Sequence, residues 1–305
     1  MGNWFKTSLL LGLLTALIVW IGDLLGGRQG MIIAFLLAMG INFFSYWYSD
    51  KIVLKTYKAR EVIPQENHEI YQIVQDIARK ADLPVPRVYI IPEKSPNAFA
   101  TGRNPEHAAV AVTEGLLQLM DRDEIMGVIS HEMAHIKNMD ILIGSIAATM
   151  AGAIMIIANM ARWTVFLGGG SDNDEEGGLG FIGLIIMSIL APLAAMLIQM
   201  AISRSREYHA DETGASLAGQ PFGLADALEK LGAYSRQLPM HSNPSTAHMF
   251  IVNPLRGHSL TNLFSTHPPL EERIARLRGI RPSVSKQPSA DSGLKKAEDF
   301  WKNLK

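Results

Sequence analysis

The sequence predicts a mainly helical α+β fold, with four transmembrane helices joined to a polar cytoplasmic part that contains a small sheet. Three observations lead to this prediction. The chain of 305 residues has a positive mean hydropathy, which is unusual for a soluble domain. Its apolar residues are concentrated in four stretches of about 20 residues, the length of a helix that crosses the hydrocarbon core of a bilayer. The segments between these stretches show helical and strand periodicities.

The four apolar stretches divide the chain into five regions. A cleaved signal peptide is the alternative for the first stretch, but no small-residue cleavage site follows it and the second stretch begins at once. The expected regions are 1–50 with spans at about 9–25 and 31–48, 51–140 as the first half of the soluble part, 141–202 with spans at about 142–167 and 179–202, 203–280 as the second half, and 281–305 as a flexible tail rich in Pro and Ser.

Basic residues predict the orientation of the spans. Cytoplasmic flanks of membrane helices carry an excess of Lys and Arg. We therefore expect both termini and both soluble segments to be cytoplasmic, with the two hairpin turns facing outward. The residues that predict this are Lys51, Lys55, Lys58 and Arg60 after the second span, and Arg204 and Arg206 after the fourth.

Composition excludes several classes of function. The 28 Lys and Arg nearly balance the 29 Asp and Glu, so no overall basic field favours nucleic acid as a partner. The chain has no cysteine, which rules out disulfides and thiolate metal sites. Any zinc must therefore be held by His, Glu or Asp.

The first soluble segment is predicted to contain a small antiparallel sheet. Residues 66–80 have helical periodicity, and Arg87–Ile91 is apolar and β-branched enough to be a strand. Two further short strands, Asn97–Gly102 and Ala108–Thr113, are joined by a turn that contains Asn104 and Pro105. A short helix over 113–120 is expected to follow.

The next predicted helix carries a pattern that suits a metal ion. Asp121–Glu124 has the composition of a helix N-cap, and His131 and His135 lie one turn apart, so both imidazoles can meet one ion. Glu132 lies beside them, where a carboxylate can hydrogen-bond a metal-held water without joining the ligand shell. A surface helix with two solvated histidines is the alternative, but the apolar face formed by Ile125, Val128, Ile129 and Ile136 argues against it.

A catalytic zinc needs a third protein ligand, and Glu207 is the candidate. The hairpin of the third and fourth spans begins soon after His135 and returns the chain to the same side of the membrane just before Glu207. Asp211 shares a helix face with Glu207 and could accept a hydrogen bond from a ligand imidazole, whereas His209 points away. A solvated acidic face beside neighbouring arginines is the competing interpretation of this pair.

The second soluble segment is predicted to be mainly helical. Helices are expected from about Arg204 to Leu217, from Leu224 to Arg236, and from Pro268 to Leu277, the last opened by prolines.

Four motifs together resemble the HtpX family of membrane zinc endopeptidases, which are relatives of the CAAX prenyl endopeptidases. They are His131–His135, Ser205–Asp211, Asn97–Gly102 and Ser265–Arg273. The resemblance implies a zincin-like cytoplasmic catalytic domain with one Zn²⁺ per chain, bound by His131, His135 and Glu207, and attack by a metal-activated water with Glu132 as the general base. It further implies degradation of damaged or misfolded membrane proteins, linked to stress, in a bacterial cytoplasmic membrane.

Three residues have weaker assignments. Asn97 begins a strand that could bind an extended peptide through backbone hydrogen bonds, although ordinary core packing explains it equally well. His267 could donate to the oxyanion or act as an extra ligand, or else cap the following helix. Arg273 could pair with an acidic neighbour.

The leading hypothesis is thus an integral-membrane zinc endopeptidase whose partners are unfolded or membrane-protein substrates and the lipid bilayer. The first alternative is a membrane protein in which the same ligands hold a structural zinc. A transporter is less consistent, because only Asp23 and Arg162 interrupt the spans, both near their outer ends. Within the enzyme class, a narrow prenyl-protein peptidase is the second alternative.

Overall fold

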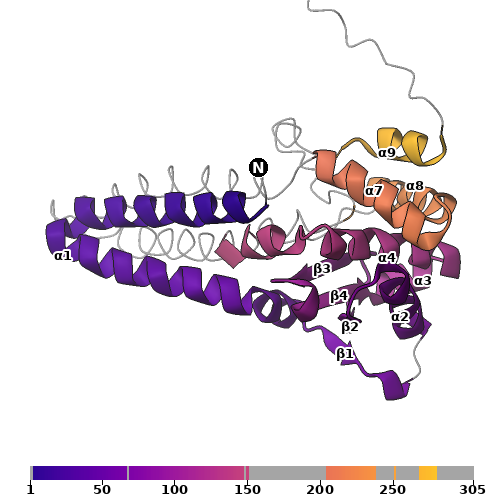
Figure 1. Cartoon of the computed structure of the whole chain (residues 1–305), viewed down its shortest axis with the longest axis horizontal. Helices are drawn as coiled ribbons and strands as arrows, with labels where there is room; N and C mark the ends of the chain where they lie inside the picture. The colour runs from indigo at the N-terminus through magenta and orange to yellow at the C-terminus, as the bar shows by residue number, and fades with distance from the viewer. Residues whose placement is uncertain are drawn as a thin grey trace, which may run out of the picture.

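The computed structural model describes residues 3–66, 69–147, 149–150, 204–237, 251 and 268–279. Across these residues a helical hairpin projects from a body that contains a four-stranded sheet and several helices (Figure 1). The predicted class, mainly helical with a small sheet, is confirmed. The predicted set of four transmembrane helices is not.

The projecting hairpin is α1 (Asn3–Thr56), which reverses direction at two glycines. Gly27 has φ 53° and ψ −144°, a conformation that side-chain-bearing residues avoid, and Gly26 before it is also non-helical. The two predicted spans at 9–25 and 31–48 are both helical. The first helix begins earlier than predicted, at Asn3, and the second continues to Thr56, because polar residues at the ends of an apolar stretch do not stop a helix.

Two contacts hold the arms of α1 together. Near the turn the arms touch through small residues, because a Cβ added at Gly22 would collide with Ala34. Further from the turn, Asn42 Nδ2 donates a hydrogen bond of 2.8 Å to Thr15 Oγ1. Small residues at the contact and a polar pair between helices are typical of helix association in lipid.

Among the described residues, one helix is long and apolar enough to cross a membrane, Gly26–Thr56. The apolar stretch in the first arm, Leu11–Trp20, is shorter. The predicted spans at 142–167 and 179–202 lie outside the described residues, apart from the start of the third span, where 141–147 and 149–150 are helical.

The sheet is mixed, so the prediction of an antiparallel sheet is wrong. Its strands have the order β1-β2-β4-β3, and β2 and β4 are parallel while the outer pairs are antiparallel. The chain leaves β2, crosses to the far edge to form β3, and returns as β4 between them, which aligns β4 with β2. The strands are β1 (Arg60–Val62), which the sequence analysis missed, β2 (Arg87–Ile91), β3 (Ala98–Gly102) and β4 (Ala108–Thr113).

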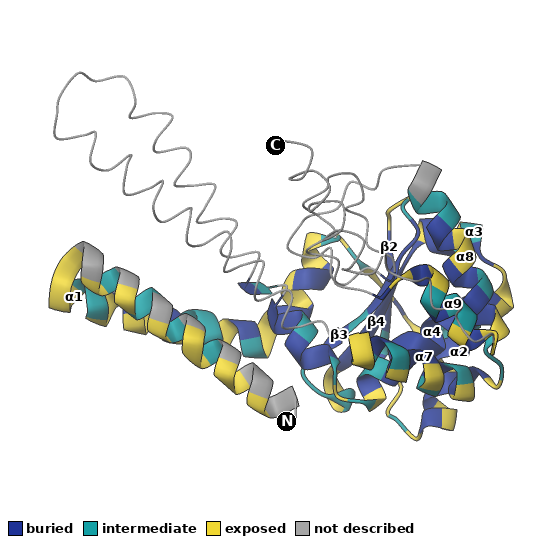
Figure 2. Ribbon diagram, turned by 90° about the horizontal axis from the view of Figure 1, so that it is seen from above, coloured by how far each residue is buried: buried dark blue, intermediate teal, exposed yellow. Residues whose placement is uncertain are grey.

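Both faces of the sheet are covered, by different parts of the molecule. On one face, strand residues such as Val88 and Val110 join the core formed with the helices of the body. On the other face, Tyr89 and Phe99 pack with Val53 near the end of α1. The base of the hairpin is therefore part of the same packed unit as the sheet, and Figure 2 shows the change from the exposed hairpin to the buried body.

The predicted helices of the body are confirmed to within a few residues at each end. The predicted N-cap is also confirmed, because Asp121 and Glu124 form a capping box at the start of α4. The helices are α2 (Glu69–Ala81), α3 (Glu114–Leu119), α4 (Arg122–Lys137), α7 (Arg204–Ala218), α8 (Phe222–Gln237) and α9 (Leu270–Leu277), with two 3₁₀ turns, η1 (Pro64–Glu66) and η2 (Pro105–His107).

Helix α4 is the centre of the body. It packs against α2, α7, α8 and the sheet, and most of its residues are buried. Gly214 of α7 allows that helix to approach closely, because a Cβ at this position would lie 2.9 Å from His131 Cα. The close contact places the first turns of α7 beside the histidines of α4.

Candidate metal centre

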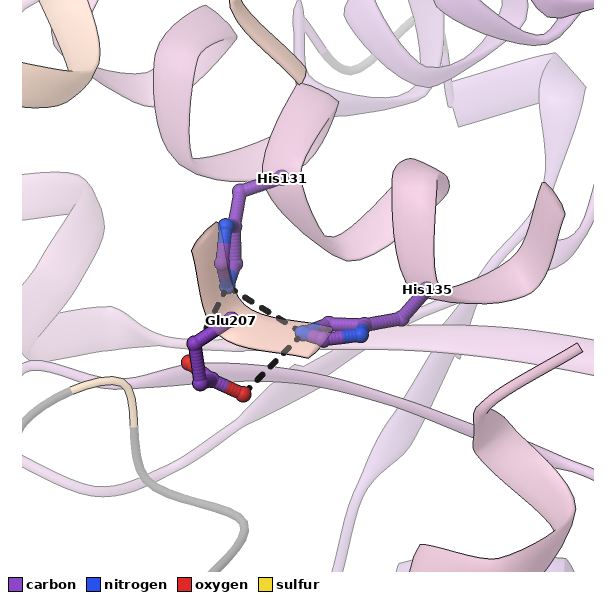
Figure 3. A group of neighbouring side chains, drawn as sticks. All are labelled: His131, His135 and Glu207. Atoms are coloured by element: carbon purple, nitrogen blue, oxygen red, sulfur yellow. Dashed lines mark hydrogen bonds and ion pairs between the residues drawn. The ribbon is translucent and has the colours of Figure 1, made fainter. Parts of the chain in front are cut away.

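Two histidines of α4 point to one place in the body. The Nε2 atoms of His131 and His135 are 3.2 Å apart, and their rings meet edge to face (Figure 3). His131 is buried and His135 is half-buried. The spacing of four residues on a helix produces this convergence, as the sequence analysis expected.

Glu207 of α7 completes a group of three possible ligands. Its Oε2 lies 3.8 Å from His131 Nε2, and its Oε1 lies 3.6 Å from His135 Nε2. The three ligand atoms all lie within 4.8 Å of one another (Figure 3). Tertiary packing, rather than proximity in the sequence, produces this arrangement, because the close contact at Gly214 fixes the position of α7.

Carboxylates flank the opposite nitrogens of the two imidazoles. Asp211 Oδ1 lies 2.9 Å from His131 Nδ1, and Asp140 Oδ2 lies 3.3 Å from His135 Nδ1. A carboxylate beside Nδ1 favours the proton on that nitrogen and leaves Nε2 unprotonated for a metal. The sequence analysis named Asp211 for such a role and missed Asp140.

Arg273 of α9 is completely buried next to this group. Its guanidinium donates two hydrogen bonds to Asp211, at 2.8 Å from Nε and 2.6 Å from an Nη, and another Nη lies 3.6 Å from Glu207 Oε2. The acidic neighbour expected for Arg273 is therefore Asp211. This pairing joins the last described helix to the metal centre.

The buried charges shift one another's pKa values. Burial disfavours the charged form of Asp211, yet the charge and hydrogen bonds of Arg273 hold the pKa of this carboxyl below its usual range. Burial likewise opposes protonation of His135, but Asp140, Glu207 and Glu132 together raise its pKa to about 9. The surrounding carboxylates therefore favour the protonated form of His135.

Glu132 is buried beside the two histidines, but its own hydrogen bond is to the sheet. Its side chain accepts a hydrogen bond of 2.8 Å from the backbone N–H of Ala100 on β3. Burial raises the pKa of its carboxyl, the neighbouring histidines oppose that shift, and Glu207 adds to it. A carboxylate with a raised pKa accepts a proton more readily than an exposed one does.

The contact with Ala100 shows how β3 is oriented. β3 forms one edge of the described sheet and pairs with β4 on its other side. The backbone groups of successive strand residues point to opposite sides of the strand. The N–H of Ala100 points to Glu132, so every second residue from Ala100 also directs its backbone groups away from β4. Ala98 and Gly102 share that direction with Ala100, and the N–H of Gly102 donates to Ser145 Oγ at 3.2 Å.

Asn97 is buried and connects several segments. Its Oδ1 accepts a hydrogen bond of 3.3 Å from the backbone N–H of Ile251, and its backbone is bonded to Thr113. The carbonyl of Ile251 in turn accepts from Arg273 at 3.3 Å. Asn97 is thus connected to the metal centre through Ile251 and Arg273.

The remaining histidines do not join the group of three within the described residues. His107 is exposed and contacts Asn104 at 2.7 Å, and His209 is exposed on the outer side of α7. His267 lies outside the described residues, as do His68, His241, His248 and His258.

Two contacts of the site were not predicted. Asp140 lies five residues after His135. Its side chain reaches the imidazole of His135 only because of the path that the chain takes after α4. The donor to Glu132 is a backbone group of Ala100, and no residue type marks such a donor in a sequence. A polar residue just beyond the motif was the available signal for Asp140.

Comparisons with known proteins agree with this geometry. The family model "Peptidase family M48" matches residues 64–281. A protein named "Protease HtpX homolog" from Desulfatibacillum aliphaticivorans is 61% identical over 310 residues, covering 100% of both chains. Another of that name, from Desulforapulum autotrophicum, is 65% identical over 278 residues, covering 91% of this chain and 90% of the relative.

One more relative of this name and one solved structure also match the chain. A "Protease HtpX homolog" from Pyrococcus furiosus is 58% identical over 280 residues, covering 92% of this chain and 96% of the relative. Among solved structures, the crystal structure of S. mikatae Ste24p matches with a TM-score of 0.48 and 18% identity, over 90% of this chain and 65% of that chain.

Proposed function

Since the chain belongs to peptidase family M48 and is a metalloprotease, we propose that it is an integral-membrane zinc endopeptidase that uses His131, His135 and Glu207 as ligands and Glu132 as the general base. The observation that supports this most strongly is the convergence of three ligand atoms within 4.8 Å, with the buried carboxylate of Glu132 beside them. The sequence named Glu207 as the candidate third ligand, and its position beside the two histidines supports that assignment.

The dimensions of the group fit zinc. Two ligands that are each about 2.0–2.1 Å from a tetrahedral ion lie about 3.3 Å from one another. The two imidazole nitrogens are 3.2 Å apart, His131 Nε2 is 3.8 Å from Glu207 Oε2, and His135 Nε2 is 3.6 Å from Glu207 Oε1. With one ligand atom taken from each residue, the three atoms lie within 4.8 Å of one another. Two nitrogens and one carboxylate oxygen also form a typical protein ligand set of a catalytic zinc, which leaves the fourth position open.

When bound, zinc supplies Lewis-acid chemistry, polarising the scissile carbonyl and lowering the pKa of the attacking water. The carboxylate of Glu132 takes the proton from this water and passes it to the nitrogen of the leaving amine as the C–N bond breaks. The N–H of Ala100 holds that carboxylate in place before the proton arrives. Asp211 and Asp140 orient the two imidazoles through their Nδ1 atoms.

We further propose that β3 binds the substrate in an extended conformation. The carbonyls of Ala98 and Ala100 and the N–H of Ala98 point away from β4 and can pair with a peptide, while the N–H of Ala100 is bonded to Glu132. Pairing through the backbone is tolerant of side chains, which suits a peptidase that removes damaged or misfolded membrane proteins. Asn97 then has a positioning role: it is hydrogen-bonded to Ile251, and Ile251 is hydrogen-bonded to Arg273. Arg273 in turn stabilises Asp211.

The proposed location is the bacterial cytoplasmic membrane, with the body and both termini on the cytoplasmic side. The support is the helix Gly26–Thr56, whose apolar side chains are largely exposed, with the basic residues Lys55 in its last turn and Lys58 just after it. The body begins directly after this helix, because its last turns pack on the sheet.

The test is a comparison of wild-type and Glu132→Gln proteins, purified in detergent without metal and then supplied with zinc. Glu132→Gln should bind zinc as the wild type does and lose about 10²–10⁴-fold in peptide hydrolysis, because a general base contributes that much. Glu212→Gln, which changes an exposed glutamate of α7, is the matched control and should retain activity. Undiminished hydrolysis by Glu132→Gln would sink the assignment and would favour a structural zinc.

A second variant tests the ligand itself. Glu207→Ala should bind less zinc than the wild type under the same conditions, because it removes one of three protein ligands. Elemental analysis of the desalted proteins measures this directly. An unchanged zinc content would mean that another residue is the third ligand.

A further inference from the structure

Two cations lie over two aromatic rings where the apolar surface of α1 ends. The guanidinium carbon of Arg103 is 4.6 Å from the centre of the Trp47 ring, and Lys51 Nζ is 5.3 Å from the centre of the Tyr48 ring. Both rings are substantially exposed, at 43% for Trp47 and 40% for Tyr48. We call these four residues the interface cluster. It joins α1 to the turn that follows β3, two segments far apart in the chain.

The cations of the interface cluster have no carboxylate partner among the described residues. Lys51 and Arg103 take part in no ion pair within that part of the chain, whereas nearby Arg87 is paired with Asp50 at 2.8 Å. Lys55, one turn beyond Lys51, is exposed and adds a further positive charge. The cluster therefore presents uncompensated positive charge beside large aromatic surfaces.

The position of the cluster along α1 indicates what it faces. The part of α1 before the cluster exposes large apolar side chains, and the last turns of α1 expose lysines. Trp and Tyr between an apolar and a basic surface are typical of the boundary between a bilayer and water. The charge on the lipid side of that boundary is the negative charge of headgroup phosphates. The exposed apolar residues before the cluster include Ile33, Phe35, Leu36, Leu37, Phe43 and Phe44.

We propose that the interface cluster binds the phosphate of an anionic phospholipid headgroup at the cytoplasmic surface of the membrane. Arg103 and Lys51 contact the phosphate, while Trp47 and Tyr48 lie at the level of the headgroups and hold the two cations in place. This inference rests on the membrane anchoring that is part of the proposed function, and it adds a ligand and the residues that recognise it.

The cluster also determines how far from the bilayer the peptidase can cut. Arg103 directly follows β3, and Ala100, which contacts Glu132, precedes it by three residues. At about 3.3 Å per residue in a strand, the general base lies about 10 Å along β3 from the headgroup level. The start of the third predicted span fixes this end of β3, because Thr101 Oγ1 and Ser145 Oγ are 2.7 Å apart. Peptide segments next to a membrane span are therefore the substrates within reach.

The first arm of the test locates Trp47 relative to the lipid. A single-tryptophan protein, with the other four tryptophans changed to Phe, is reconstituted in vesicles of phosphatidylcholine and phosphatidylglycerol. Nitroxide-labelled lipids then quench its fluorescence, with the label either on the headgroup or deep in the acyl chain. Headgroup labels should quench Trp47 more strongly.

The second arm measures lipid binding by native mass spectrometry of protein released from the same vesicles. Arg103→Gln should retain phosphatidylglycerol with about fivefold lower affinity than the wild type, the effect expected for one interfacial cation. Arg79→Gln is the matched control, since Arg79 is an exposed arginine of α2 outside the interface cluster, and it should behave as the wild type.

The outcomes separate this inference from the proposed function. Stronger quenching by the deep label, or equal phosphatidylglycerol retention by Arg103→Gln and the wild type, would overturn the interface cluster alone. Absence of quenching by either label would overturn both the cluster and the membrane anchoring. Neither readout requires hydrolysis, so failure of the zinc peptidase assignment would appear only in the assays with Glu132→Gln.

Discussion

The body and the α1 hairpin place their large apolar side chains differently, inside the body but largely on the surface of the hairpin. In the body, apolar side chains form the core and the few interior charges, such as Arg273 and Glu207, contact one another. In the hairpin, large apolar side chains such as Leu36 are exposed and the polar pair of Thr15 and Asn42 lies between the arms. The two regions are therefore built for different solvents, and the metal centre belongs to the one that faces water.

This difference shows how the metal centre tolerates so much buried charge. An isolated interior charge is costly, but each one here has a partner. Asp211 contacts both Arg273 and His131, and Asp140 contacts His135. The residues proposed to bind the metal are stabilised by charged neighbours outside the ligand set, so removing one of these neighbours should lower the stability of the body strongly.

The largest effect is expected for Arg273→Leu. It leaves Asp211 and Glu207 buried without their cation, so the zinc-free body should lose about 3–5 kcal/mol of its free energy of unfolding. Urea titration in detergent measures the change. The double variant Arg273→Leu with Asp211→Leu should recover part of it, because both charges are then absent. Unaltered stability of Arg273→Leu would show that the pair is not needed for folding.

A pair of leucines compares the two regions directly. Leu228→Ala should cost about 2–5 kcal/mol, because this side chain is fully buried in the body and its loss leaves a cavity. Leu36→Ala should leave the stability in detergent within about 0.5 kcal/mol of the wild type, because Leu36 is 64% exposed and surface changes have small effects. The same urea titrations provide both values. Equal losses would mean that the hairpin is packed like the body.

A small effect, comparable to that of Leu36→Ala, is expected for Asn42→Ala. It removes the hydrogen bond to Thr15, and such bonds between membrane helices average only about 0.6 kcal/mol. Thermal unfolding in detergent should therefore shift slightly, with zinc content unchanged. A loss as large as that of Leu228→Ala would indicate that this polar pair organises the hairpin.

Much of the local structure could be predicted because it depends on neighbouring residues. Helical periodicity located α2 and α4, and Asp121 with Glu124 marked the start of α4. β2 was predicted with its observed bounds, Arg87–Ile91, because its apolar and β-branched residues are continuous. The pairing of the strands could not be predicted in the same way. The parallel contact of β2 with β4 depends on β4 lying between β2 and β3, which is decided by tertiary packing.

The metal centre shows the same division. By itself the sequence determined that His131 and His135 meet on one face of a helix and that Glu132 lies beside them, because helix geometry follows from spacing alone. Only the tertiary structure decided that Glu207, Asp140 and Ala100 reach this place, because contacts between segments far apart depend on how helices and strands pack. Packing at Gly214 and the edge position of β3 supplied what spacing could not.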